Sequence, residues 1–177
     1  MSAAAAVLVT NGCSQPDNGP LRNVRGLLTL SDLNKAPILA TIYVILSEIE
    51  TTLAQLIDVA CTDPWEWIQK LSRQRQAQVL GYWELAKKQN VDAGAILSCT
   101  LGDLVIIGRK IDPVRNVFVF RNIAGRDALD CLRDLRNRVA HPIAPLVRGI
   151  EDVKTLGATL TYAVEMLSRL NDHQVEG

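Results

Sequence analysis

The chain has 177 residues, of which 48% are hydrophobic and 21% are charged, and its formal net charge is zero. This length and composition are typical of a soluble globular protein with one core and a short appendage. The zero net charge argues against a protein that coats nucleic acid indiscriminately. The apolar runs are far shorter than the ~20 residues of a membrane-spanning helix, and the segment after Met1 lacks the basic start of a secretory signal. We therefore expect a cytoplasmic protein.

The first part of the chain, residues 1–35, differs in pattern from everything that follows. Two apolar runs, 5–10 and 24–33, flank a segment that is rich in Gly, Pro, Asn and Asp. Such a pattern is typical of a β-hairpin with a long turn. The stretch Arg25 to Leu33 (RGLLTLSDL) resembles the closing strand and helix start of a CBS repeat, a module that senses adenosyl ligands. Because the rest of the repeat is missing, we expect an element for packing or dimerisation that binds no adenosine nucleotide.

Residues 36–177 show the periodicity of amphipathic helices. Pro37 suits the first position of a helix whose apolar stripe runs to about Cys61. Asp63, followed three residues later by Glu66, predicts the start of a second helix that continues to about Gln89. The middle of this second helix, 72–78, is polar, so we expect the helix to leave the core there.

Three more segments complete the predicted fold. Thr100 and Asp103 form a second capping signal for a short helix that ends at Gly108. Asp112-Pro113 predicts a turn, and the apolar run 117–120 predicts a buried connection. Two amphipathic helices follow, and the last one, 150–170, leaves a frayed polar tail. The fold class is therefore mainly α, an up-and-down bundle of four or five helices with a short N-terminal β-hairpin.

Polar chemistry is concentrated on the helix that ends at Pro142, over the segment LRDLRNRVAHP. At 100° per residue, its apolar residues fall within roughly 60° of one another and form a buried stripe. This stripe consists of Ala128, Leu132, Leu135 and Val139. On the opposite side, Arg133, Asn137 and His141 are spaced by four residues and form what we term the polar ridge. Arg136 lies at the edge between stripe and ridge, and Pro142 places His141 at or just beyond the last turn.

Arg136 and His141 form an Arg-x4-His pattern with Asn137 directly after the arginine and a leucine-arginine lead-in. This pattern resembles the signature of the HEPN superfamily, and the resemblance covers roughly Pro37 to Leu170. It implies a HEPN-like helical bundle that acts as a metal-independent endoribonuclease and homodimer, with Arg136, Asn137 and His141 as catalytic residues. It also implies a toxin or a defence or stress effector with an inhibitory protein partner, acting on single-stranded RNA or tRNA.

Cleavage of RNA without a metal requires three things of these side chains. The 2′-hydroxyl must be activated, charge on the transition state must be neutralised, and the leaving 5′-oxygen must be protonated. His141 can act as acid or base, and Arg136, with Arg133 as a further candidate, can stabilise the phosphate. Asn137 can orient the imidazole or bond a phosphate oxygen. Since one histidine cannot readily perform both proton transfers, a two-fold dimer that supplies a second His141 suits this chemistry.

Basic residues are enriched around the motif. From Arg109 to His141 there are eight basic and four acidic residues, so this segment carries a charge of +4 that the rest of the chain cancels. Seven of the eight are arginines, whose planar guanidinium matches phosphate, and we assign Arg133 and Arg138 to RNA binding. In the alternative interpretation these arginines form simple surface pairs along the helix, Asp130 with Arg133 or Asp134 with Arg138.

The remaining candidate residues favour no cofactor and no metal. Cys61, Cys99 and Cys131, like Cys13, occur singly without a Cys-x-x-Cys pair, so we interpret these three as small core residues. Glu48 and Glu50 are expected on a solvated face of the first helix. The alternative function is a non-catalytic HEPN-like binding or dimerisation module. In that case the motif residues cap a helix end and the arginines bind an acidic partner or a nucleotide.

Overall fold

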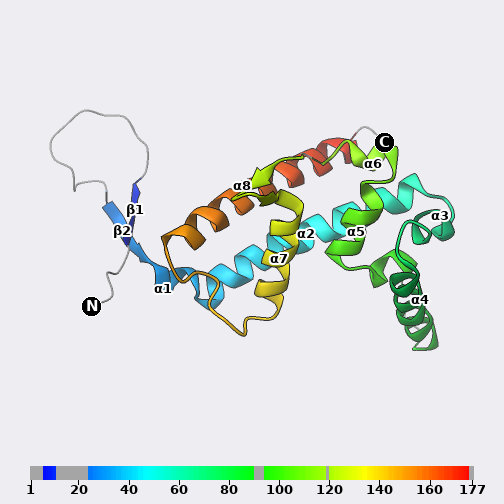
Figure 1. Ribbon diagram of the computed structural model, residues 1–177, viewed down its shortest axis with the longest axis horizontal. Coiled ribbons are helices and arrows are strands. Elements are labelled where there is room, and N and C mark those ends of the chain that lie inside the picture. Colours follow the sequence, from blue (N-terminus) through cyan, green and yellow to red (C-terminus); the bar gives the residue numbers. More distant parts are fainter. Residues whose placement is uncertain (1–5, 11–23, 90–93, 119, 176–177) are drawn as a thin grey trace.

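The computed structural model describes residues 6–10, 24–89, 94–118 and 120–175. Over these residues the protein is mainly helical with a short N-terminal hairpin, which confirms the predicted fold class. The two longest helices, α2 (Ala36–Ala60) and α8 (Ile150–Val175), contact each other and run in the same general direction (Figure 1). Helices α5 (Leu101–Gly108) and α7 (Ala128–Ala140) both pack against α2.

Helix α2 is the centre of the bundle. Pro37 lies in its first turn and Cys61 follows its last residue, as the sequence pattern predicts. Its buried side chains face α8, α5 and α7, and they are Ile42, Leu46, Ile49, Thr52, Leu53, Ala54 and Ile57. Within the part of the chain that the structure describes, α2 is the one helix that is long and apolar enough to cross a membrane, by length and composition alone.

The second predicted helix is divided in two, so the prediction of one continuous helix to Gln89 is wrong. It forms α3 (Pro64–Ile68) and α4 (Arg73–Lys88), separated by a turn in which the Leu71 amide donates to the Ile68 carbonyl (3.0 Å). The hydroxyl of Ser72 accepts from the Arg75 amide (3.4 Å) and caps the new helix. Leu71 is buried at this turn, and α4 then points away from α2 (Figure 1). Residues 73–78 are mostly exposed, but Val79 in the middle of α4 is buried again.

The connection between α5 and α7 contains short elements that sequence periodicity does not resolve. The predicted turn at Asp112 is a one-turn helix, α6 (Asp112–Arg115). Of the predicted buried connection, Val117 and Phe118 are buried, Phe120 is 58% exposed, and position 119 lies outside the described residues. A tight hairpin follows, formed by β3 (Asn122–Ile123) and β4 (Arg126–Asp127). Its two turn residues, Ala124 and Gly125, have φ angles of 50° and 77°, which only glycine adopts readily.

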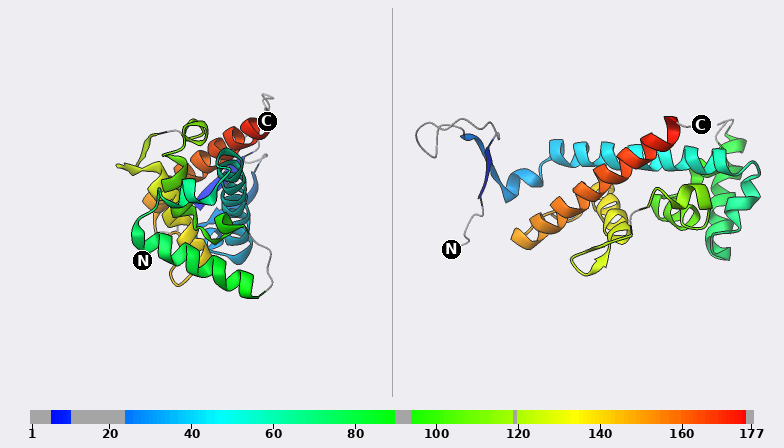
Figure 2. Two further views of the ribbon diagram at one scale, coloured as in Figure 1. Left: turned by 90° about the vertical axis from the view of Figure 1, so that its right-hand side faces the viewer. Right: turned by 90° about the horizontal axis from the view of Figure 1, so that it is seen from above.

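The N-terminal hairpin lies beyond one end of the bundle (Figures 1 and 2). Strands β1 (Ala6–Thr10) and β2 (Val24–Thr29) pair antiparallel, and the predicted long turn between them lies outside the described residues, with Cys13. Helix α1 (Leu30–Leu33) leads to α2 and begins with a capping box, in which the Thr29 amide and hydroxyl donate to Asp32 (2.8 and 2.7 Å). Hydrogen bonds from Lys35 and Thr29 hold the pKa of Asp32 below its usual range.

The cysteines of the described residues belong to the core, as predicted. Cys61 and Cys131 are buried and Cys99 is half-buried. Burial raises the pKa of Cys99 to about 12, so its thiol stays protonated at neutral pH. Over the described residues, no three His, Cys, Asp or Glu side chains are grouped in a way that could hold a metal ion.

Candidate functional site

Helix α7 presents the candidate site, and its frame follows the predicted pattern. Asp127 caps its start by accepting from the Leu129 amide (2.8 Å), and the predicted stripe is buried along its length. His141 follows the last helical residue, with φ −130° and ψ 74°. Its amide donates to the Asn137 carbonyl (3.0 Å), and its carbonyl accepts from the Ile143 amide (2.7 Å). The sequence therefore predicts correctly that His141 lies just beyond the last turn.

Arg136 lies in the seam between α7 and α2, where it pairs with Glu50. Its Nε donates to Glu50 Oε1 (2.8 Å) and its Nη2 lies 3.5 Å from Oε2. The two side chains are only 24% and 19% exposed. The expectation of a solvated face is confirmed for Glu48, which is exposed, but it is wrong for Glu50. The edge of the Arg136 guanidinium that carries Nε and Nη2 faces the Glu50 carboxylate, and its remaining N–H groups can bind another acceptor.

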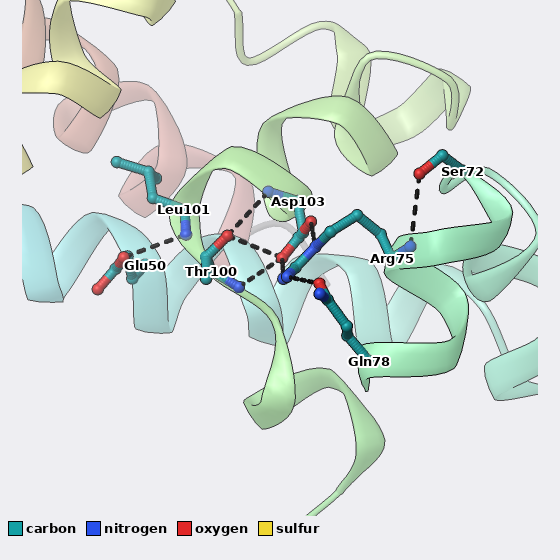
Figure 3. A network of polar contacts seen from close by, with 7 residues as sticks. All are labelled: Glu50, Ser72, Arg75, Gln78, Thr100, Leu101 and Asp103. Carbon is teal, nitrogen blue, oxygen red and sulfur yellow. Dashed lines mark hydrogen bonds and ion pairs between the residues drawn. The ribbon is translucent and has the colours of Figure 1, made fainter. Parts of the chain in front are cut away.

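Glu50 is itself held by the start of α5, as Figure 3 shows. The Leu101 amide donates to Glu50 Oε1 (3.1 Å), so the free N–H of a helix N-terminus faces this carboxylate. The predicted capping box is present, since the Thr100 amide and hydroxyl donate to Asp103 Oδ2 (2.9 and 2.7 Å). The start of α5 therefore holds Glu50 in place, and Glu50 in turn holds Arg136.

A half-buried ion pair between α4 and α5 supports this arrangement (Figure 3). Arg75 Nε donates to Asp103 Oδ1 (2.9 Å), and its Nη2 and Nη1 donate to Asp103 Oδ2 and to Gln78. The Asp103 side chain is only 4% exposed. Burial raises the pKa of its carboxyl, but the hydrogen bonds from Arg75 and Thr100 outweigh burial and hold that pKa below its usual value. The polar stretch 72–78 signals this contact in the sequence, although its partner in α5 cannot be found from periodicity.

The polar ridge is exposed along its whole length, as predicted. Asn137 and His141 are exposed, and neither side chain has a hydrogen-bond partner among the described residues. Arg133 is 46% exposed and pairs with Asp130 (3.2 Å) and more distantly with Asp134 (3.8 Å). Since five helical residues correspond to about 140° of rotation, Arg136 and His141 leave α7 in different directions. One copy of the chain thus places Arg136 in the seam, and Asn137 and His141 on the open surface.

Arg138, predicted to bind RNA, contacts the protein itself. Its Nη2 donates to the Pro145 carbonyl (3.0 Å) and to the Leu146 carbonyl, so it holds the segment that follows His141. It does not pair with Asp134, which binds Arg126 instead (2.5 Å). Of the two surface pairs that the alternative interpretation expected, the one between Asp130 and Arg133 is therefore present and the other is absent.

Several other arginines of the basic segment are also paired with acids. Arg109 lies 2.8 Å from Asp127, and Arg121 lies 2.9 Å from Glu165 on α8. These pairs are about one-third exposed, so they neutralise much of the local charge without a ligand. The segment therefore does not form a broad surface of unpaired basic charge.

A cavity of about 230 Å³ opens beside the Arg136–Glu50 pair. Both side chains line it, together with Thr51 of α2 and with residues of η1 (Ala95–Ser98) and α5. An arginine with spare N–H donors at the edge of such a cavity can bind a phosphate oxygen.

Comparisons of the chain with protein-family models, with curated proteins and with solved structures found no match.

Proposed function

We propose that the protein is a HEPN-like endoribonuclease of the cytoplasm that cleaves RNA without a metal ion. The observation that carries this proposal is the different state of the two motif residues. Arg136 is fixed by Glu50 beside a cavity, whereas His141 is exposed with no side-chain partner among the described residues. A fixed cation and a free imidazole are what phosphate binding and proton transfer require, respectively.

In this reaction the 2′-oxygen of the RNA attacks the neighbouring phosphorus, and the bond from phosphorus to the 5′-oxygen breaks. His141 takes the proton from the 2′-hydroxyl or gives one to the leaving 5′-oxygen. Arg136 neutralises the negative charge that develops on the phosphate, and Glu50 keeps its guanidinium in place. Asn137 orients the imidazole or bonds a phosphate oxygen, and Arg133 binds the RNA backbone. The products are a 2′,3′-cyclic phosphate and a 5′-hydroxyl.

The geometry of one chain favours a site that two chains share. Arg136 and His141 of one chain point about 140° apart around α7, and each chain supplies one motif histidine. A two-fold dimer brings the ridge of one copy to the seam of the other and supplies the second proton-transfer group. We further propose single-stranded RNA or tRNA as substrate, and a role as a toxin or as a defence or stress effector with an inhibitory protein partner.

The protein is accordingly expected to be a homodimer at micromolar concentration. Sedimentation velocity over a hundredfold range of concentration measures the mass, and the same samples are assayed for RNA cleavage. Activity per chain should fall where the dimer dissociates. A monomer that retains full activity would contradict the shared site.

The test of the reaction itself is incubation of labelled single-stranded RNA and tRNA with the protein in excess EDTA. We expect cleavage that EDTA does not inhibit, with products that end in a 2′,3′-cyclic phosphate. Such 3′-ends should resist 3′-end labelling until a phosphatase active on cyclic phosphates has removed the phosphate. If every RNA stays intact, or if cleavage stops in EDTA, the assignment fails.

A second candidate function, a non-catalytic binding or dimerisation module, is favoured by the intramolecular contacts of the arginines. Arg133, Arg136 and Arg138 all have partners within the protein, which a structural role explains without RNA. The two functions differ in what they require of His141. In a binding module His141 serves as a helix cap, so replacing His141 should lower the stability of the protein. In an enzyme, replacing His141 should greatly reduce RNA cleavage with little loss of stability.

A further inference from the structure

The segment that follows His141, residues 142–149, connects α7 to α8 without regular secondary structure. Its first residues are open to solvent, and Ile143 is 95% exposed. Farther along, Leu146 and Val147 are buried. The segment is thus anchored at Val147, six positions after the candidate catalytic histidine.

Val147 is held by Asn34, which lies at the junction between α1 and α2. The Asn34 Nδ2 donates to the Val147 carbonyl (2.9 Å), and the Val147 amide donates back to Asn34 Oδ1 (2.9 Å). One side-chain amide therefore satisfies both backbone groups of a residue 113 positions away. Nδ2 also donates to the Leu30 carbonyl (2.9 Å), which ties the same amide to α1.

The two residues before Val147 are held by Arg138. Its guanidinium donates to the Pro145 and Leu146 carbonyls, next to the bonds of Asn34. One cavity is lined by Pro142 and Ile143 of this segment and also by Asn34, Leu39 and Arg138. The backbone from His141 to Val147 is therefore constrained at both ends and bonded between them, which limits the positions from which the His141 side chain leaves the backbone.

We propose that Asn34 is a positioning residue for His141, which it orients by clamping Val147. The positioning role rests on the proposed function, because it matters only if His141 transfers protons. The clamp also links the N-terminal hairpin to the site, since Asn34 follows α1 directly and bonds to it.

The variants Asn34→Ala and Asn34→Asp test the clamp. The first removes all three hydrogen bonds, and the second keeps the shape but loses the Nδ2 donor. Asn116→Asp is the matched control, because Asn116 is exposed and its side chain has no partner among the described residues. Hydrogen–deuterium exchange at the Val147 amide should be roughly tenfold faster in Asn34→Ala, which removes the Oδ1 acceptor of this amide, and unchanged in the control. In Asn34→Asp a carboxylate oxygen can still accept from the Val147 amide, so the increase in exchange should be smaller. Wild-type exchange at Val147 in Asn34→Ala would overturn the clamp.

Nuclear magnetic resonance of the imidazole rings tests the effect on His141 without any assay of cleavage. The chain has only two histidines, so His173, near the end of α8, serves as an internal reference. In both Asn34 variants the His141 ring signals should shift or broaden, while those of His173 stay in place. If the His141 signals match the wild type, the positioning role is overturned, whether or not the protein cleaves RNA.

The kinetic expectation is a loss of turnover. In Asn34→Ala, kcat should fall roughly tenfold with KM for RNA within about twofold, because Asn34 is remote from the phosphate-binding Arg136. Full cleavage by an Asn34 variant with altered His141 signals would overturn the positioning role and leave the ribonuclease assignment intact. An inactive wild-type protein would remove the ribonuclease assignment, and with it the positioning role, while the exchange result still decides the clamp.

Discussion

Replacement of His141 by alanine should lower the rate of RNA cleavage by about 10²–10⁴-fold, the range typical of a lost general acid or base. RNA binding should survive, since the imidazole carries no contact that orders the arginines. The free energy of unfolding should change by less than about 0.5 kcal/mol, because the side chain is exposed without a partner among the described residues. Single-turnover cleavage, RNA titration and melting curves measure the three quantities on the same samples.

Three further variants separate proton transfer from binding and from folding. His173→Ala is the matched control and should behave as the wild type. Arg133→Ala should weaken RNA binding and reduce its salt dependence, with little effect on cleavage at saturating RNA. Arg136→Ala should lower cleavage and also leave Glu50 without its cation. If His141→Ala cleaves as fast as the wild type, the enzyme assignment is wrong; if it melts far below the wild type, His141 is a structural cap.

The elements that the sequence predicts best are those with a long, regular apolar stripe. The start and end of α2 and the buried face of α7 follow from residues three and four positions apart, because helix packing against a core requires this spacing. The capping box at Thr100 is also predictable, since its donor and acceptor lie within one turn. Each of these features depends on local chemistry alone.

The features that the sequence does not predict depend on contacts between distant residues. Glu50 and Arg136 are 86 positions apart, so no local pattern distinguishes Glu50 from Glu48. At the break between α3 and α4, Leu71 is buried and Ser72 caps the new helix, which an unbroken helical pattern does not reveal. The left-handed Ala124 is likewise set by the hairpin around it and not by its own preference.

The candidate site shows the same division. Spacing along α7 predicts which face each motif residue takes, and the structure agrees for Arg133, Asn137 and His141. Of their contacts it predicts only the pair of Arg133 with Asp130. Arg138 could be assigned to RNA from its charge, yet its guanidinium bonds backbone carbonyls of the protein. A motif thus predicts the residues of a site better than their individual roles, because a role depends on the partner.

Replacement of Asp103 by asparagine should lower the free energy of unfolding by about 2–3 kcal/mol. The Asp103 side chain is only 4% exposed, and its carboxylate accepts from Arg75 and from the Thr100 amide and hydroxyl. Removing the charge leaves Arg75 unpaired, but at 31% exposure Arg75 can still reach water, so the cost stays below that of a fully buried pair. Asp134→Asn, which breaks the exposed pair with Arg126, is the matched control and should cost less than about 1 kcal/mol.

The dependence of this effect on pH has a definite sign. The folded pKa of Asp103 is lowered, so its contribution is fully present above the unfolded value of about 3.9 and is lost as the pH falls through the lower folded value. Urea unfolding should therefore give a constant difference between wild type and Asp103→Asn from pH 7 to 5, and a shrinking difference below about pH 4. A double-mutant cycle with Arg75→Met isolates the ion pair. If Asp103→Asn costs no more than Asp134→Asn, or if its effect grows in acid, the pair does not hold α4 on α5.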